Sequence, residues 1–187
     1  MKIKIEKFFD DSFSIASFGP SWIHIAYNEF IDFFKADEEI TEHKFIIGAY
    51  FTYGWMPIML NLEDHISAAV EIANRAKSID RINDKEMGVL AFAVNGSFVG
   101  ASKLLHFINP DLYSIWDSRV YRYLYDEPPY QYRLECISKH REYLSLVKKI
   151  EKDTRCNQLV DNVSSSIGYN ISSNRSAELV MYLKGGK

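Results

Sequence analysis

Apolar side chains recur at the three- and four-residue spacing of an α-helix through most of this 187-residue chain. Strand-like alternation is limited to the short stretch Lys2–Ile5. The helical spacing predicts helices over residues 22–34, 62–77, 85–94, 101–108 and 133–151, with a last helix that ends at residue 183. We therefore expect an all-α fold.

Capping and helix-breaking residues mark the ends of these predicted helices. Side chains suited to an N-cap precede three of them: Ser21, Asp84, and either Ser173 or Asn174. Asn95-Gly96 is expected to end one helix. Asn109-Pro110 is expected to begin another, because proline suits a first helical turn.

The aromatic range 46–60 interrupts the helical pattern. It contains Gly48, Gly54 and Pro57, so we expect a loop or a broken helix there. The chain contains neither an internal repeat nor a segment with the composition of a linker. We therefore expect residues 1–187 to form a single helical domain. That domain can consist of two helical lobes around a cleft.

Charge is distributed unevenly along the chain. The net charge is −3, which excludes a strongly basic protein that coats nucleic acid. Residues 1–100 carry 9 basic and 15 acidic side chains, whereas residues 131–187 carry 10 basic and 6 acidic ones. The basic part either forms one wall of a cleft or is an ordinary solvated helix surface.

The number of cysteines and the hydropathy of the sequence exclude further classes of protein. Cys136 and Cys156 are the two cysteines, too few for a disulfide framework or a four-cysteine metal cluster, and the histidines show no metal-ligand spacing. We expect neither a metal nor another cofactor. The sequence has no apolar run of membrane-spanning length and no apolar signal core near Met1, so a cytoplasmic protein without membrane contact is expected.

The range 95–124 carries the strongest chemical signal. It contains a predicted hairpin, a short apolar helix, a connection and a carboxylate at a new helix start. Gly96 and Gly100 permit a positive φ or a close backbone approach. The amides that follow Gly100 can face an anion. Asp117 follows the apolar pair Ile115-Trp116, which favours partial desolvation of its carboxylate.

This order resembles the helix-hairpin-helix DNA glycosylases, the HhH-GPD superfamily. The resemblance covers residues 84–126. Within this range, Phe98-Val99-Gly100 is similar to the hairpin of the family, and residues 115–122 are similar to its aspartate segment. Residues 175–183 are similar to the closing helix of small members. Ser97-Phe98 stands where the family has proline and glycine. Lys103 lies one residue beyond the family's lysine position, which is occupied by Ser102.

The resemblance implies that Asp117 is the catalytic carboxylate. Cleavage of an N-glycosidic bond builds positive charge on the sugar, which a nearby carboxylate stabilises. The alternative is that Asp117 only caps the helix that follows it. Lys103 is the second catalytic candidate, as a Schiff-base nucleophile, but it is equally suited to binding a phosphate or pairing with a carboxylate.

DNA contacts and a base pocket complete the expected site. Gly100 of the hairpin is expected to bind DNA, together with Ala101 and Ser102, which follow it. Arg119 and Arg122, three apart on one helix face, either reach phosphates or bridge to neighbouring acidic residues. The base pocket candidates are aromatic: Tyr50, Tyr53, Trp55 and Trp116. The first three are equally suited to filling the core. His106 is expected to be a hydrogen-bonded core histidine.

The sequence therefore predicts a monofunctional DNA glycosylase that acts on a base flipped out of double-stranded DNA. The target is either a damaged base, as in DNA repair, or a modified base of phage DNA, as in antiviral defence. The alternative function is a non-catalytic helical module that binds DNA or a protein through the hairpin and the aromatic segment. The oligomeric state stays open.

Overall fold

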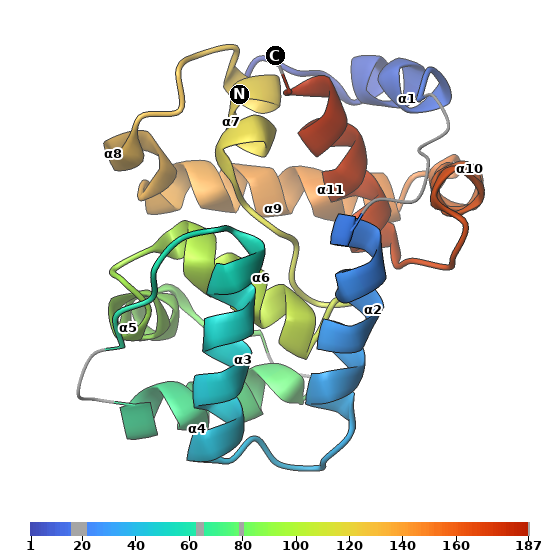
Figure 1. Ribbon diagram of the computed structural model, residues 1–187. Helices are drawn as coiled ribbons and strands as arrows, with labels where there is room; N and C mark the ends of the chain where they lie inside the picture. Colours follow the sequence, from blue (N-terminus) through green and yellow to red (C-terminus); the bar gives the residue numbers. More distant parts are fainter. Residues whose placement is uncertain (16–21, 63–65, 79–80, 187) are drawn as a thin grey trace. The chain divides into compact units, whose positions relative to one another are not determined.

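The computed structural model of the protein describes residues 1–15, 22–62, 66–78 and 81–186. This described part contains eleven helices, and the pairing of Leu62 with Val94 is an isolated bridge rather than a strand (Figure 1). The predicted all-α class is confirmed. None of the described helices is long and apolar enough to cross a lipid bilayer.

The chain divides into two compact units. The central unit comprises Ser21–Tyr113, and the terminal unit combines Met1–Pro20 with Ser114–Lys187. The helices of the central unit are α2 (Trp22–Lys35), α3 (Glu42–Trp55), α4 (Ile66–Lys77), α5 (Asp84–Ala93) and α6 (Phe98–Ile108). Those of the terminal unit are α1 (Ile5–Phe13), α7 (Ser118–Tyr125), α8 (Gln131–Leu134), α9 (Ile137–Glu151), α10 (Cys156–Ile167) and α11 (Ser173–Lys184).

The core of the central unit is aromatic and centres on α6. This helix packs against α2, α3, α4 and α5. The rings of Phe30 and Phe51 stack with centroids 4.3 Å apart, and Phe107 on α6 meets Phe30 edge-on at 5.2 Å. Many of the chain's aromatic residues are therefore used to fill this core.

The prediction of a loop or broken helix over residues 46–60 was wrong for its first two thirds. Helix α3 runs through Gly48 and Gly54 and ends at Trp55, just before Pro57. A Cβ atom on Gly48 would lie 2.2 Å from the ring of Phe34 on α2. Gly48 therefore serves close packing between two helices and does not break α3.

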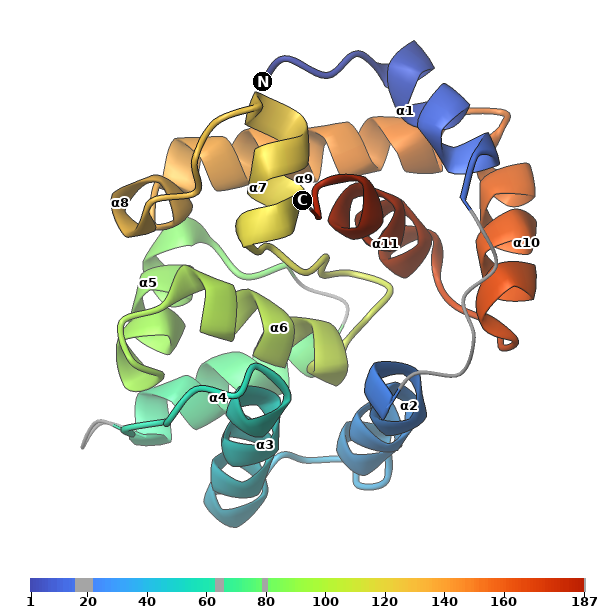
Figure 2. The same ribbon diagram turned by 45° about the horizontal axis from the view of Figure 1, so that its top comes forward.

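In the terminal unit, α11 packs against α1, α7, α9 and α10 (Figure 2). Trp116, Tyr121 and Tyr143 are fully buried there and form much of the core. The ring centroids of Trp116 and Tyr143 are 5.3 Å apart. These large side chains bring α7 and α9 to the segment that precedes Asp117.

Several predicted boundaries differ from the structure. Lys2–Ile5 is not a strand, although the Lys2 amide bonds to the Leu124 carbonyl at 2.8 Å, and α1 begins at Ile5. The predicted helix 133–151 is two helices, α8 and α9, separated at Glu135 and Cys136. Helices α1 and α10 were not predicted.

The capping predictions also change in detail. Asn83, rather than Asp84, caps α5, and Ser172 caps α11. Asn109-Pro110 does not begin a helix: the Asn109 carbonyl accepts from the amide of Tyr113 in a turn. The predicted cap at Ser21 and part of the predicted helix 62–77 fall outside the described residues, and α4 begins at Ile66.

Candidate functional site

A tight turn joins α5 to α6, as the sequence predicts. Asn95 and Gly96 both adopt a left-handed backbone, with φ of +60° and +63°. Ser97 then caps α6 by accepting a hydrogen bond from the Gly100 amide at 3.1 Å. The turn that connects α5 to α6 spans residues 94–97 and is called the hairpin below (Figure 1). Phe98-Val99-Gly100, which the resemblance places in the hairpin, instead form the first turn of α6.

The side chain of Asn95 fixes the neighbouring chain segment to this hairpin. Its amide nitrogen donates to the Met59 carbonyl at 2.8 Å, and its oxygen accepts from the Asn61 amide at 2.7 Å. An isolated β-bridge between Leu62 and Val94 joins the same two chain segments. The hairpin therefore has two polar supports outside the helices that it connects.

Tyr53 supports the hairpin from α3. Its hydroxyl donates to the Val94 carbonyl at 2.6 Å, and its ring lies directly against Gly100. The predicted close approach at Gly100 is therefore present, and its partner is a buried tyrosine of the same unit. For Tyr53, this is the core role that the sequence left as the alternative to a base pocket.

Lys103 lies beside another of the predicted pocket residues. Its Nζ atom is 5.5 Å from the centroid of the Trp55 ring, and Trp55 in turn meets Phe107 edge-on at 5.3 Å. This is cation–π geometry, which the sequence did not predict. Tyr50, on the same helix as Trp55, is 51% exposed.

The side chains of Ala101 and Ser102 are buried. The Ser102 hydroxyl donates to the Val99 carbonyl at 2.9 Å within α6. The Ala101 amide donates to the Ser97 carbonyl at 2.9 Å, so it does not face an anion as the sequence analysis expected.

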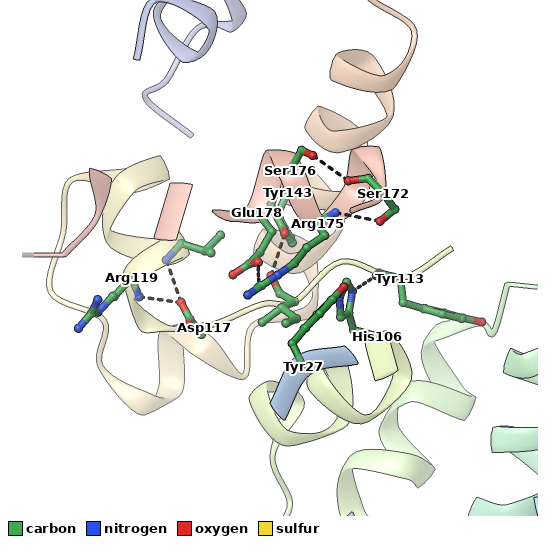
Figure 3. Close-up of polar contacts among 12 residues, drawn as sticks. Tyr27, His106, Tyr113, Asp117, Arg119, Tyr143, Ser172, Arg175, Ser176 and Glu178 are labelled. Atoms are coloured by element: carbon green, nitrogen blue, oxygen red, sulfur yellow. Dashed lines mark hydrogen bonds and ion pairs between the residues drawn. The ribbon is translucent and has the colours of Figure 1, made fainter. Parts of the chain in front are cut away.

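Asp117 is the N-cap of α7 and is only 7% exposed. Its Oδ1 atom accepts from the amides of Arg119 and Val120 at 2.9 and 3.0 Å (Figure 3). Both capping bonds end on this one oxygen. The cap thus fixes the plane of a buried carboxylate through the backbone, and the capping role that the sequence left open is present.

The segment before Asp117 is held by three other elements of the terminal unit. The Tyr143 hydroxyl on α9 donates to the Ile115 carbonyl at 2.8 Å (Figure 3). The Trp116 indole donates to the Leu134 carbonyl at 2.9 Å, and the Ser114 hydroxyl bonds to Asn174 on α11 at 3.0 Å. Trp116 is fully buried in this arrangement.

Arg119 and Arg122 both lie against the end of α11. The guanidinium of Arg119 is 4.5 Å from the centroid of the Tyr182 ring, and Arg122 donates to the Gly185 carbonyl at 2.8 Å. The acidic neighbour Glu127 is paired with Arg133 at 3.1 Å. Within the terminal unit, the two arginines therefore help to attach α7 to α11.

An ion pair that the sequence analysis missed lies near Asp117. Arg175 and Glu178, one turn apart on α11, are paired and are 3% and 1% exposed (Figure 3). The three-residue spacing of Arg175 and Glu178 predicts that they are neighbours on one helix face, but not that they are buried. Because α11 is covered on several sides, both charges are buried.

These charges act on two tyrosines that also lie within reach of Asp117. Burial raises the pKa of Tyr143 well above its usual value, and the charges of Glu178 and Asp117 raise it further. Burial also raises the pKa of Tyr182, with Arg119 opposing the rise and Asp117 adding to it. The region around Asp117 is therefore a buried, charged environment in which both phenols stay protonated.

His106 is a core residue, as the sequence predicts. It is fully buried in the central unit, where its Nδ1 atom is 2.7 Å from the Tyr113 carbonyl and its Nε2 atom is 2.8 Å from the Tyr27 hydroxyl (Figure 3). A carbonyl only accepts, so Nδ1 carries a proton, and in the neutral imidazole Nε2 then accepts from Tyr27.

The predicted site residues are divided between the two units. The central unit pairs Tyr53 with Gly100 and Trp55 with Lys103, while the terminal unit holds Asp117. Among the residues that the structure describes, no group of three or more His, Cys, Asp or Glu side chains is arranged to hold a metal ion. Comparisons with protein-family models, with curated proteins and with solved structures found no match.

Proposed function

We propose that this chain is a DNA N-glycosylase of the helix-hairpin-helix type, in which Asp117 is the catalytic carboxylate. The observation that carries the proposal is the fixed, buried carboxylate at the first turn of α7. Its backbone is held by α9 and α11 through Ile115 and Ser114. A carboxylate that is oriented before the reaction can stabilise positive charge on a sugar without reorganising.

The reaction that this arrangement supports is hydrolysis. Water attacks the C1′ carbon of the target nucleotide as the bond to the base nitrogen breaks, and the base leaves with the electron pair. The carboxylate of Asp117 stabilises the positively charged sugar and accepts the proton of the attacking water. No covalent enzyme intermediate is required, which agrees with a monofunctional enzyme.

The hairpin supports the DNA-binding part of the proposal. A helix amino terminus favours a phosphate, and the turn at Asn95 and Gly96 leads directly into α6. Lys103 adds a positive charge one turn after Gly100. The substrate is double-stranded DNA with a damaged or modified base, and base release in repair or in defence against phage DNA would use the same chemistry.

The test is release of free base from duplexes that carry a panel of damaged bases and hypermodified cytosines. Asp117→Asn isolates the charge, because asparagine caps helices as well as aspartate does and already caps α5 at Asn83. We expect base release to fall by about a thousandfold in Asp117→Asn, with an unchanged unfolding midpoint. Asp161→Asn, at an exposed carboxylate on α10, should release base at the wild-type rate.

Two results would contradict the proposal. One is that the wild-type protein releases no base from any duplex of the panel. The other is that Asp117→Asn is as active as the wild type. A non-catalytic binding module predicts that Asp117→Asn keeps DNA or protein binding, while Tyr53→Ala and Gly100→Ala lose it.

A further inference from the structure

Two exposed tyrosine rings stack on each other after α7. Tyr130 is 56% exposed and Tyr132 is 69% exposed, which makes them the most exposed of the large apolar side chains described in the terminal unit. Their ring centroids are 6.0 Å apart, and the ring planes differ by 18°. Adjacent aromatic rings that stay this exposed point to a binding surface.

Arg133 holds the two rings in place. Its Nε atom donates to the Tyr132 hydroxyl at 3.0 Å, and its guanidinium lies 5.3 and 5.5 Å from the centroids of Tyr130 and Tyr132. The same guanidinium bonds to the Pro128 carbonyl and to Glu127, each at 3.1 Å. The rings are therefore oriented before any ligand binds, which lowers the entropy lost on binding.

Cationic side chains act on Glu127, the carboxylate that is paired with Arg133. The pKa of Glu127 is lowered, first by the hydrogen bond from Tyr121 and then by the charges of Arg133, Lys139 and Lys2. Three cations thus lie within electrostatic reach of this one carboxylate. The terminal unit as a whole has 15 basic and 12 acidic residues, a net charge of +3, although the full chain carries −3.

We propose that Tyr130, Tyr132 and Arg133, here called the tyrosine platform, bind an unstacked base of a nucleic-acid strand. Aromatic faces that accept any base, next to cations that attract phosphates, are the two features of single-strand binding sites. As a contact to DNA the inference rests on the proposed function, since a glycosylase must hold a strand whose stack has been opened. The binding itself does not require Asp117.

A protein partner is the competing occupant, because exposed tyrosine and arginine are also common in protein interfaces. The parallel rings and the positive charge of the unit favour a strand with bases and phosphates. The two occupants differ in their response to salt, since phosphate contacts weaken steeply as the salt concentration rises.

The test measures binding of a fluorescein-labelled oligothymidine of about twelve nucleotides, a length that covers one single-strand site. Fluorescence anisotropy is recorded for the full chain at several salt concentrations. We expect the double variant Tyr130→Leu/Tyr132→Leu to bind about tenfold more weakly or worse, with the salt dependence of the wild type. Arg133→Lys, which keeps the charge but loses the planar contact, should also weaken binding.

The matched control is Phe92→Leu, which removes a similarly exposed ring from α5 in the central unit and should leave the affinity unchanged. The inference is overturned if the wild type does not bind the oligonucleotide, as expected of a protein-binding surface, or if the double variant binds it equally well. Base release is measured separately. Tyrosine-dependent binding without base release contradicts the proposed function alone, whereas base release with tyrosine-independent binding contradicts this inference alone.

Discussion

A Cβ atom on Gly100 would lie 2.1 Å from the phenolic oxygen of Tyr53. That oxygen also donates to the Val94 carbonyl, at the beginning of the hairpin turn. Tyr53 therefore contacts the chain on both sides of the turn, and α6 approaches α3 this closely because residue 100 has no side chain. The position of the hairpin within the central unit depends on this contact.

Gly100→Ala should destabilise the protein by about 1–3 kcal/mol, because the added methyl group displaces a buried ring. Gly88→Ala is the matched control, since a Cβ atom on this α5 glycine meets nothing within 4 Å. That substitution should stabilise the helix by about 0.5–1 kcal/mol. Urea unfolding measures both, and a Gly100→Ala variant as stable as the wild type would contradict the close approach.

The buried pair of Arg175 and Glu178 makes a second prediction. Arg175→Met leaves the charge of Glu178 buried without this partner and should cost about 3–5 kcal/mol, measured by urea unfolding. The double variant Arg175→Met/Glu178→Leu should recover most of that loss, because no carboxylate of the pair then stays buried. A double variant as unstable as Arg175→Met would show that the pair is needed for packing.

The exposed pair of Lys7 and Asp11 is the control for this experiment. The two groups are one turn apart on α1 at 3.0 Å, and the Lys7 side chain is well exposed. Solvent screens such a pair, so Lys7→Met should cost less than about 1 kcal/mol. The difference between the losses of stability in Lys7→Met and Arg175→Met then measures the effect of burial on an ion pair.

Helical periodicity was enough to predict the fold class and most helices of the central unit. It misjudged α3, because the sequence does not show whether a glycine such as Gly48 breaks a helix or admits a ring from another one. The structure places Phe34 against Gly48, a contact between residues far apart in the chain. Tertiary packing of this kind overrides a local breaker signal.

In the candidate site, the sequence predicted local features but not contacts between helices. The cap at Asp117 and the turn at Asn95-Gly96 depend on neighbouring residues, so local sequence predicts them. Burial of Arg175 and Glu178 depends on how α11 is covered by four other helices, which no local pattern encodes. The cation–π contact between Lys103 and Trp55 also joins different helices, α6 and α3, and the sequence did not predict it.

His140 on α9 gives the protein a pH-dependent stability. It is 8% exposed, packs against Trp116 with ring centroids 5.9 Å apart, and its Nε2 atom has no hydrogen-bond partner among the described residues. Burial lowers its pKa to about 4. The folded protein therefore keeps His140 neutral at a pH where the unfolded chain, with a pKa of about 6.5, takes up a proton.

Uptake of that proton stabilises the unfolded chain relative to the folded protein. The contribution of His140 to the free energy of unfolding is therefore complete above about pH 6.5 and is lost as the pH falls toward 4. We expect His140 to account for a loss of about 2 kcal/mol between about pH 7 and pH 5. His140→Phe should have a flatter pH profile of the free energy of unfolding in this window, measured by urea denaturation. Because both proteins share all other titrating groups, parallel profiles would mean that His140 is not buried in its neutral form.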